Sequence, residues 1–356
     1  MTVNEKTDLY SLTSDELREF VASLGEPAFR AKQIAAWLPL GTPISEMSNL
    51  SKALREKLAE KTLDTLPRVE KKLVSKIDGT VKYLFSLHDG ACIESVFMRY
   101  KHGNTLCISS QVGCRMGCRF CASTIGGKVR DLLPSELLGQ VIAAQRDTGE
   151  RVSNIVMMGI GEPLDNFDNV IKFLRLVNSE DGLNIGYRHI SLSTCGVVPR
   201  IRELAEIELP ITLSISLHAA TDEKRSAIMP VNNKWSISQL LDACSYYYTR
   251  TGRRISFEYT LISGKNDSKV DARELAELLN GVFRKISAPI HVNLIRVNEV
   301  SETGFRQGTT ESANEVARTL ESCGITATVR RRLGSDVNAA CGQLRRSQNK
   351  QSEENA

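Results

Sequence analysis

The sequence of 356 residues lacks the long hydrophobic runs that would place a protein in or across a membrane. No apolar stretch approaches the roughly 20 residues that a bilayer-spanning helix needs. The opening residues, MTVNEKTDLY, also lack the apolar core of a secretory signal peptide. We therefore expect a cytoplasmic protein with no membrane partner.

A strong excess of charge of one sign is also missing. The formal net charge is +4, from 46 Lys and Arg against 42 Asp and Glu. This value is too small to indicate a nucleic-acid partner, so any basic surface must come from local clustering of charge. Hydrophobic content of 41% and charged content of 25% are typical of a globular protein.

Cysteine is the residue type that the chain does have, with nine in all. In a reducing cytoplasm, clustered thiols more often serve metals or catalysis than structural disulfides. Four thiols are expected to pack as small hydrophobic side chains, namely Cys92, Cys195, Cys244 and Cys323. The remaining thiols are a close triplet, Cys114, Cys118 and Cys121, and the separate residues Cys107 and Cys341.

Residues 1–67 predict a helical domain, and residues 68–103 predict a small antiparallel β meander. Thr13 and Glu16 form a capping box ahead of the apolar pattern at 17–24, and further amphipathic segments follow at 29–38 and 51–62. Beyond residue 67 the apolar period becomes that of strands, at 69–76, 80–88 and 92–100. The dipeptides at 78–79 and 89–90 are both Asp-Gly, which favours hairpin turns.

Residues 104–345 alternate between strand and helix patterns, which predicts an α/β fold with a parallel sheet. Strands are expected at 104–110, 154–159, 189–194, 212–218, 255–262 and 291–297, and helices at 134–147, 169–178, 201–207, 237–250, 272–283 and 312–324. Six units are too few for a closed eightfold barrel, so we predict a partial (β/α)6 barrel. Its chemistry should lie at the C-terminal ends of the strands. The polar tail at 346–356 is expected to be disordered.

The triplet of cysteines follows the first predicted barrel strand with the spacing C-x3-C-x2-C. Zinc ribbons use two C-x2-C pairs and redox motifs use one, so neither accounts for this pattern. A 4Fe–4S cluster needs four ligands, and three thiolates would leave one iron open to another ligand. A zinc site or a chance grouping is the alternative.

The spacing, its place after the first strand and the aromatic Phe120 between the last two cysteines resemble the radical S-adenosylmethionine (SAM) superfamily. The resemblance implies that SAM binds the open iron and that an electron from the cluster cleaves it to a 5′-deoxyadenosyl radical. The run MMGIGEPLDN resembles the GGEP-like motif of this superfamily, so Gly161 and Glu162 would hold the methionine amino group. A plain glycine turn is the alternative. Further SAM contacts are expected from polar or backbone-exposing rim positions, namely Ser193, Ser216, Leu217, His218 and Asn298.

Over residues 10–345, the runs TLCISSQVGC, GIGEP, LSTCGVVP, SISLHA, HVNLI and AACGQL resemble the RlmN/Cfr family of radical SAM methyltransferases. The resemblance implies methylation of one adenine in 23S ribosomal RNA, with two SAM molecules per turnover. Cys341 would carry a methyl group from the first SAM and add it to the base as a carbon radical. Glu94 would remove the ring proton. Cys107 would attack the sulfur of Cys341, leaving a disulfide and the methylated base.

The same resemblance implies 23S ribosomal RNA as a partner, with transfer RNA as a second candidate substrate. We also expect a flavodoxin or ferredoxin as electron donor and a monomeric chain. Several basic runs near one rim would form a phosphate-binding track, and the candidates are 71–72, 253–254, 330–332, 345–346 and the residues Arg115, Arg119 and Lys128.

Members of this family methylate either C2 or C8 of adenine. Pro163 and Val112 resemble the C2 enzymes, whereas Arg296 resembles the C8 enzyme that confers antibiotic resistance. Asn338 departs from the usual second aspartate of the motif D-x-D-A-A-C. The balance predicts C2. Two readings of other classes stay open, namely a radical SAM enzyme without methyl transfer and an RNA-binding protein with a structural iron–sulfur cluster.

Overall fold

The computed structural model describes residues 6–298 and 304–337. Its N-terminal part is helical, with α1 at Ser14–Ser23, α2 at Phe29–Ala35 and α3 at Lys52–Lys61. Helix α1 begins at the predicted capping box, in which Thr13 Oγ1 accepts a hydrogen bond from the Glu16 N–H and Glu16 Oε2 accepts one from the Thr13 N–H. A short parallel pair, β1 at Thr7–Asp8 and β2 at Thr62–Leu63, ties the ends of this region together and was not predicted.

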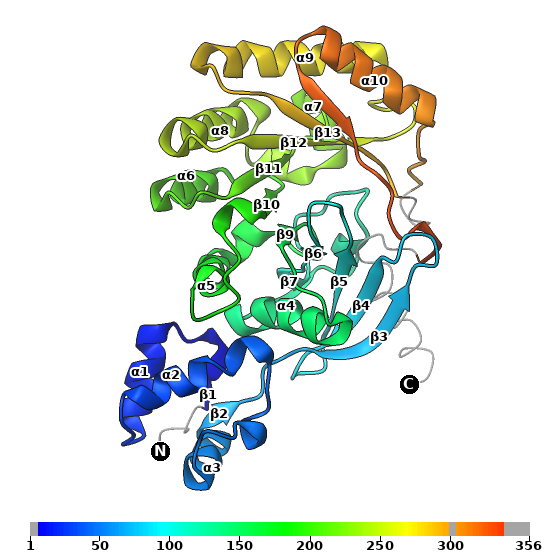
Figure 1. The fold of residues 1–356 in the computed structure, drawn as a ribbon. Helices are drawn as coiled ribbons and strands as arrows, with labels where there is room; N and C mark the ends of the chain where they lie inside the picture. The colour runs from blue at the N-terminus through cyan, green and yellow to red at the C-terminus, as the bar shows by residue number, and fades with distance from the viewer. Residues whose placement is uncertain (1–5, 299–303, 338–356) are drawn as a thin grey trace.

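The helical region packs on the barrel beside α4 (Pro134–Thr148) and α5 (Phe167–Asn178), as Figure 1 shows at the blue end of the chain. Asp8 accepts hydrogen bonds from Thr65 within its own region and from Ser135 on α4, at 2.8 and 2.6 Å. Lys172 on α5 forms an ion pair with Glu16 at 2.8 Å. Polar contacts, together with apolar packing, therefore orient the helical region on the barrel.

The meander has three antiparallel strands, β3 at Arg68–Val74, β4 at Val81–Ser86 and β5 at Cys92–Met98. Strand β3 is an exposed edge, whereas β4 and β5 are almost wholly buried. Strand β5 also pairs antiparallel with the first barrel strand. The meander is thus an extension of the barrel sheet rather than a separate layer.

One ten-stranded sheet runs in the order β14-β13-β12-β11-β10-β9-β6-β5-β4-β3. Its parallel part comprises β6 (Thr105–Cys107), β9 (Asn154–Met157), β10 (Ile190–Thr194), β11 (Thr212–Ser216), β12 (Ile255–Leu261), β13 (His291–Arg296) and β14 (Thr326–Val329). The outer helices are α4, α5, α6 (Val198–Ile207), α8 (Ile237–Thr251), α9 (Lys269–Phe283) and α10 (Thr310–Ser322). The predicted α/β partial barrel is confirmed. Within the described residues, no helix is long and apolar enough to cross a bilayer.

Three details differ from the predicted barrel. The segment at 326–329 forms a seventh parallel strand, β14. The expected strand at 104–110 is interrupted after Cys107, and the chain then forms β7 (Gln111–Gly113), which pairs with β8 (Lys128–Asp131). Gly113 has φ +82°, and a Cβ there would lie 2.0 Å from the carbonyl oxygen of Gly127. Close approach of these two strands requires glycine, and it places the cysteine triplet beside the barrel mouth. A short helix, α7 (Asp222–Ile228), was also not predicted.

Candidate active site

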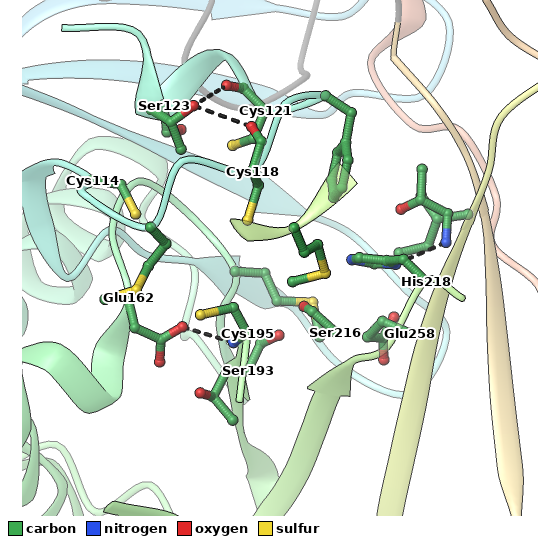
Figure 2. A pocket seen from close by; sticks show the side chains of 18 of the residues that line it. Cys114, Cys118, Cys121, Ser123, Glu162, Ser193, Cys195, Ser216, His218 and Glu258 are labelled. Atoms are coloured by element: carbon green, nitrogen blue, oxygen red, sulfur yellow. Dashed lines mark hydrogen bonds between the residues drawn. The ribbon is translucent and has the colours of Figure 1, made fainter. Parts of the chain in front are cut away.

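A cavity of about 1160 Å³, its open mouth included, lies at the C-terminal ends of the barrel strands. Figure 2 shows the thiols of the triplet along one side and Ser216, Glu258 and His218 on another. The predicted residues that line the cavity are Cys114, Cys118, Cys121, Gly161, Glu162, Ser193, Ser216, His218 and Asn298. Leu217 does not line it, because its side chain is fully buried in the main core.

The loop that carries the triplet is held by its own backbone, by one hydroxyl and by a bond to α7, in which the Arg119 N–H donates to the Ile228 carbonyl at 2.9 Å. The Cys114 N–H donates to the Gly127 carbonyl at 3.0 Å, and the Cys121 N–H donates to the Cys118 carbonyl at 3.0 Å. The Thr124 hydroxyl donates to the carbonyls of Cys118 and Cys121 at 3.1 and 2.9 Å. These bonds leave the three sulfur atoms as the free polar ends of the loop, directed toward the cavity (Figure 2).

The thiols are close enough to disfavour each other's ionisation. Burial raises the pKa of Cys114 to about 12. Burial also raises the pKa of Cys118, and the neighbouring Cys121 and Cys114 add to that rise. Cationic iron would reverse this effect, because a metal favours the thiolate.

This donor set fits an iron–sulfur cluster, since three soft sulfur ligands line one wall without a fourth ligand in the same loop. In the part of the chain that the structure describes, no three His, Cys, Asp or Glu side chains converge as a preformed site for a single metal ion. The three thiols therefore fit a cluster better than a single ion, because a cluster is larger and its ligands lie farther apart. The fit rests on the chemistry of the three thiols.

Gly161 and Glu162 sit where the backbone after β9 meets the start of β7. Gly161 has φ +106°, and a Cβ there would lie 2.6–2.7 Å from atoms of Gln111 and Ser110. The Glu162 carboxylate accepts hydrogen bonds from the backbone N–H of Cys195 at 2.7 Å and of Leu164 at 3.0 Å. Burial raises the pKa of Glu162, and these hydrogen bonds oppose the rise. The carboxylate is therefore held in one orientation at the cavity wall, suited to an ammonium group.

His218 takes an unusual backbone conformation for a residue other than glycine, with φ +60°. Its carbonyl accepts a hydrogen bond from Asn266 at 2.8 Å, and its Nδ1 accepts one from the Thr260 N–H at 2.9 Å. Its ring meets Phe120 edge to face, with ring centroids 4.9 Å apart. Burial, together with the nearby positive charge of Arg225, lowers the pKa of His218 to about 3. The ring is therefore neutral near pH 7 and joins the cluster loop to the far wall of the cavity.

Sequence analysis missed Arg225, a fully buried arginine on α7. Its guanidinium donates to the carbonyls of Cys195 at 2.7 Å, Ser216 at 3.1 Å and Leu217 at 3.1 Å. It thereby fixes the ends of β10 and β11, which carry the predicted SAM contacts. A single charged residue in a predicted loop gives no sign of this role, because its partners are backbone atoms of distant strands.

Glu258, which was not predicted, and Arg330, which was predicted only as part of a basic run, also line the cavity. Glu258 accepts hydrogen bonds from Asn293 at 2.7 Å and Ser256 at 3.2 Å. Burial raises the pKa of Glu258, and Arg330 opposes that rise. Arg330 Nη1 donates to the Met158 sulfur at 3.5 Å. Alternation along a strand indicates which side chains face the barrel interior. The sequence does not show which of these side chains reach a ligand.

Cys107 and Glu94 lie on one face of the sheet extension, next to the cavity. Lys82 is paired with Val96, and Val96 with Cys107, across β4, β5 and β6. Glu94 shares the Val96 face of β5, because side chains alternate along a strand. Glu94 and Lys82 are both buried and form an ion pair of 3.1 Å. Glu94, which was predicted as the catalytic base, is therefore a buried, paired carboxylate.

A small apolar cluster of Val96, Met98 and Cys107 covers this face, and Met158 packs against it. Burial raises the pKa of the Cys107 thiol, whereas Arg330 lowers it. Met158 and Arg330 also line the cavity, so the two regions share one wall. Cys341 and Asn338 lie outside the described residues, and so does the predicted Cys107–Cys341 pairing.

The predicted basic track is only partly assembled at this rim. Residues 253–254 directly precede β12, so they lie at the opposite end of the barrel from the cavity. Lys128 forms ion pairs with Asp131 and Asp165 at 2.8 and 2.9 Å, and Arg115 also pairs with Asp165. The arginines at 330–332 follow the C-terminal end of β14, on the cavity side. Residues 345–346 lie outside the described chain.

The residues weighed for regiochemistry do not line the cavity. Val112 and Pro163 are buried in the strand and turn around it. Arg296 donates from Nη1 to the Thr310 hydroxyl at 3.0 Å, toward the start of α10, while its neighbours Ile295 and Val297 line the cavity. Any influence of these three residues on the reacting carbon is therefore indirect.

Two family models match the chain. The radical SAM superfamily model matches residues 108–276, and the model of the ribosomal RNA large subunit methyltransferase N-terminal domain matches residues 7–63. A solved radical SAM methyltransferase from Sphaerobacter thermophilus is 41% identical with a TM-score of 0.89, and the match covers 95% of this chain and 98% of that one.

Curated relatives match almost end to end. The probable dual-specificity RNA methyltransferase RlmN of Alkaliphilus oremlandii is 55% identical over 343 residues, 96% of this chain and 98% of that protein. The protein of the same description from Clostridium perfringens is 55% identical over 342 residues, 96% of this chain and 97% of that protein. Identity at this level over the helical region, the barrel and the sheet extension leads to one conclusion: the chain belongs to the RlmN family of radical SAM RNA methyltransferases.

Proposed function

We propose that this protein methylates C2 of one adenine in 23S ribosomal RNA through a methylated Cys341. The observation that carries the proposal is the wall shared by two sulfur-bearing regions. Met158 and Arg330 line the cavity of the cysteine triplet, and Met158 also packs against the cluster that contains Cys107. A methyl-derived carbon bound at the cavity would therefore stay close to Cys107 while it is transferred to the base.

Membership of the radical SAM superfamily implies a 4Fe–4S cluster and SAM. When bound, they supply a methyl group and a 5′-deoxyadenosyl radical. Cys114, Cys118 and Cys121 would ligate the cluster. Glu162, held by two backbone N–H groups, would accept a hydrogen bond from the SAM amino group. Polar contacts from the rim would complete the site, from Ser193, Ser216, His218 and Asn298 and from the backbone at Leu217.

The chain's own residues would then perform the transfer. C2 of adenine lies between two ring nitrogens and is a poor nucleophile, which favours radical addition over polar attack on a sulfonium methyl. Cys341 would take a methyl group as a thiolate nucleophile and present the activated carbon to C2. Two SAM molecules would be used in each turnover, one as methyl donor and one as radical source.

Release of the product would require Glu94 and Cys107. Glu94 would remove the C2 proton, with Lys82 as its buried cationic neighbour at 3.1 Å. Cys107 would attack the sulfur of Cys341, so that an S–S bond forms as the S–C bond to the base breaks. The released carbon would take up a proton and become the methyl group, and the unpaired electron left by radical addition would return to the bound iron–sulfur cluster. Burial keeps Cys107 protonated until then, because its pKa is raised, and Arg330 is the nearby cation that opposes this.

The same reading extends to the partners. The relatives in Alkaliphilus oremlandii and Clostridium perfringens are described as dual-specificity enzymes, which supports transfer RNA as a second substrate. We propose a flavodoxin or ferredoxin as electron donor, a monomeric enzyme and a cytoplasmic location. A target adenine would have to leave its stack to reach the cavity.

A denaturing gel with labelled ribosomal RNA fragments tests the relay. Cys107→Ala should trap a covalent protein–RNA adduct, because methylation and addition precede any use of the second thiol. Cys341→Ala should give neither adduct nor product. Normal turnover by Cys107→Ala would contradict the resolving role, and RNA methylation by Cys341→Ala would contradict the relay itself.

Mass spectrometry and nuclear magnetic resonance of the modified nucleoside test the reacting carbon. A methyl group at C2 is expected. A methyl group at C8 would identify the resistance-type enzyme. SAM cleavage without RNA methylation would indicate a radical enzyme of another class, and RNA binding without SAM cleavage would indicate a structural cluster.

A further inference from the structure

Two Lys or Arg side chains are buried in the part of the chain that the structure describes, those of Lys82 and Arg225. Lys82 forms an ion pair with Glu94, so its charge is balanced within the protein. Arg225 on α7 differs, because its four hydrogen bonds go to backbone carbonyls and to the Asn232 side-chain oxygen, and none goes to a carboxylate. A buried charge without a partner of opposite sign is costly, so a further negative charge near Arg225 is expected.

Asp222 is the carboxylate that is linked to Arg225, and the link runs through Asn232. Arg225 Nη1 donates to Asn232 Oδ1 at 2.9 Å, and Asn232 Nδ2 donates to Asp222 Oδ1 at 2.9 Å. Asp222 is exposed to solvent, which screens its charge, whereas Arg225 is 1% exposed. Asp222 therefore balances the guanidinium only in part.

Helix α7 and the turn after it contact the loop of the cysteine triplet. The Arg119 N–H of that loop donates to the Ile228 carbonyl, at the end of α7, at 2.9 Å. A Cβ on Gly117 would lie 3.5 Å from Pro230, so the loop and the turn are in close contact. Met229, between helix and turn, lines the cavity together with the three thiols. The buried guanidinium is thus carried by the element that supports the triplet loop.

The guanidinium lies behind the cavity wall rather than in it. Its Nη2 donates to the Cys195 carbonyl at 2.7 Å, and Cys195 lines the cavity with Cys118 (Figure 2). Arg225 itself does not line the cavity. Burial raises the pKa of the Cys118 thiol, and Arg225 opposes that rise. Arg225 therefore acts on the triplet through space, as a fixed positive charge.

A fixed positive charge at this place would act on the electron affinity of a bound cluster. A 4Fe–4S cluster with three thiolate ligands carries net negative charge, and accepting an electron makes it more negative. Coulomb attraction favours the more negative form, and it is stronger in a buried site than in water. Glu162, the buried carboxylate on the same wall, acts in the opposite direction until a bound ammonium group offsets it.

We propose that Arg225 balances the negative charge of the cluster held by the triplet and thereby raises the reduction potential of that cluster. This inference rests on the proposed function, in its assignment of Cys114, Cys118 and Cys121 as the ligands. The electron comes from a low-potential one-electron donor, and Arg225 itself is neither oxidised nor reduced. Its three bonds to the carbonyls of Cys195, Ser216 and Leu217 keep the charge in place.

Redox titration of the reconstituted enzyme, followed by electron paramagnetic resonance of the reduced cluster, measures the potential without turnover. Arg225→Gln removes the charge and keeps an amide that can donate to a carbonyl. The ratio of reduced to oxidised cluster at a fixed potential should fall about tenfold, which is a shift of about 59 mV for one electron. Arg225→Lys keeps the charge and should restore most of the potential.

Asn232→Asp tests the charge without removing the guanidinium. A carboxylate oxygen at this position would still accept from Arg225 Nη1, and the bonds from Arg225 to the strand ends would persist. Because the added negative charge would neutralise Arg225, the reduced fraction should fall in this variant as well. This variant decides the question if Arg225→Gln fails to fold or to hold a cluster.

Lys224→Gln is the matched control, since Lys224 precedes Arg225 on the same helix. Lys224 is partly exposed and pairs with Asp271 and Glu274 at 2.8 Å each. The control therefore removes a cation that carboxylates already balance, and its cluster potential should equal that of the wild type. A shift as large as that of Arg225→Gln would mean that any change on α7 alters the potential, and it would overturn the inference.

The rate of 5′-deoxyadenosine formation separates a changed potential from a damaged SAM site. With a mild reductant, Arg225→Gln should form the product more slowly than the wild type. Excess titanium(III) citrate, a strong one-electron reductant, should remove most of that difference. A difference that persists, with potential and iron content unchanged, would assign Arg225 to holding the strand ends and would overturn its role toward the cluster.

Each remaining failure has its own signature. An unchanged potential in Arg225→Gln and Asn232→Asp, both with full iron content, would overturn this inference and leave the proposed function standing. Equal shifts in Arg225→Lys and Arg225→Gln would also overturn it, because the lost carbonyl contacts would then be the cause. A cluster retained after all three triplet cysteines are changed to Ala would overturn the ligand assignment and this inference with it.

Discussion

The two sulfur-bearing regions of this enzyme are built in opposite ways. The triplet of Cys114, Cys118 and Cys121 comes from one loop, held mostly by hydrogen bonds within that loop and by one bond to α7. The Cys107 region comes from β4, β5 and β6, which strand register brings together, and from Leu333, which follows β14. Three thiols can therefore be brought together by eight consecutive residues, whereas the Cys107 region needs three strands paired in register.

Their electrostatics differ in the same sense. The triplet thiols disfavour each other's ionisation and require an external cation to become ligands. The Cys107 region contains its own cations, Lys82 beside Glu94 and Arg330 near the thiol. The first region depends on a bound group for its charge balance, and the second is balanced by the chain itself.

Removing the triplet should have the largest effect and should leave the Cys107 region intact. We expect Cys114, Cys118 and Cys121 changed together to Ala to bind no iron and to form no 5′-deoxyadenosine. The fold should persist, because the loop bonds involve backbone and Thr124 rather than sulfur. Iron and sulfide analysis with circular dichroism checks this. Stoichiometric iron in the variant would show that other residues hold the cluster.

Breaking the buried ion pair should damage the second region and spare the first. Lys82→Met leaves the Glu94 carboxylate buried without its cation, which typically costs about 3–5 kcal/mol of unfolding free energy. Combining it with Glu94→Leu should restore much of that stability while activity stays lost. Urea unfolding of the single and double variants measures both effects. Equal losses of unfolding free energy in Lys82→Met and in the double variant would mean that the unpaired Glu94 charge does not cause the loss.

Lowering the pH should destabilise the folded protein through protonation of His218. Its pKa of about 3 lies below the usual 6.5, so the folded protein binds fewer protons than the unfolded chain between these values. Stability is fully present above pH 6.5 and falls as pH drops toward 3, by up to about 1.4 kcal/mol per pH unit.

His218→Asn should flatten this acid slope. Asparagine tolerates the positive φ, and its side-chain oxygen can accept the Thr260 N–H. Urea unfolding at pH 7, 6, 5 and 4 compares the two proteins. An unchanged slope in the variant would assign the acid sensitivity to other groups.

A thiol outside both regions should have the smallest effect. Cys323 ends α10 and is half-buried; its hydrogen bonds are made by backbone atoms, and its side chain packs at the edge of the main core. Cys323→Ala should change unfolding free energy by less than about 0.5 kcal/mol and leave RNA methylation unchanged. Thermal unfolding and a methylation assay check it. A clear loss of activity would mean that a third thiol takes part in the reaction.

Much of the fold and the first region could be predicted from the sequence. Alternating apolar patterns and Asp-Gly turns indicated the meander, and the strand–helix alternation indicated the partial barrel. The seventh strand, β14, was missed because four residues carry too weak a pattern. The interruption after Cys107 was missed because residues 109–110 make their backbone hydrogen bonds to Gln140 and Ile160 rather than to a neighbouring strand, and the sequence does not show these partners.

The sequence by itself determined the cysteine triplet, because ligand spacing within one loop survives any arrangement of the rest. It also determined the order of strands and helices, because apolar periodicity reflects which face each element buries. Only the tertiary structure decided that Glu94 is buried against Lys82, that Arg225 fixes two strand ends, and that Asp336 reaches Ser75. Each of these contacts joins residues on different structural elements, and the sequence alone does not show which residues of different elements meet in space.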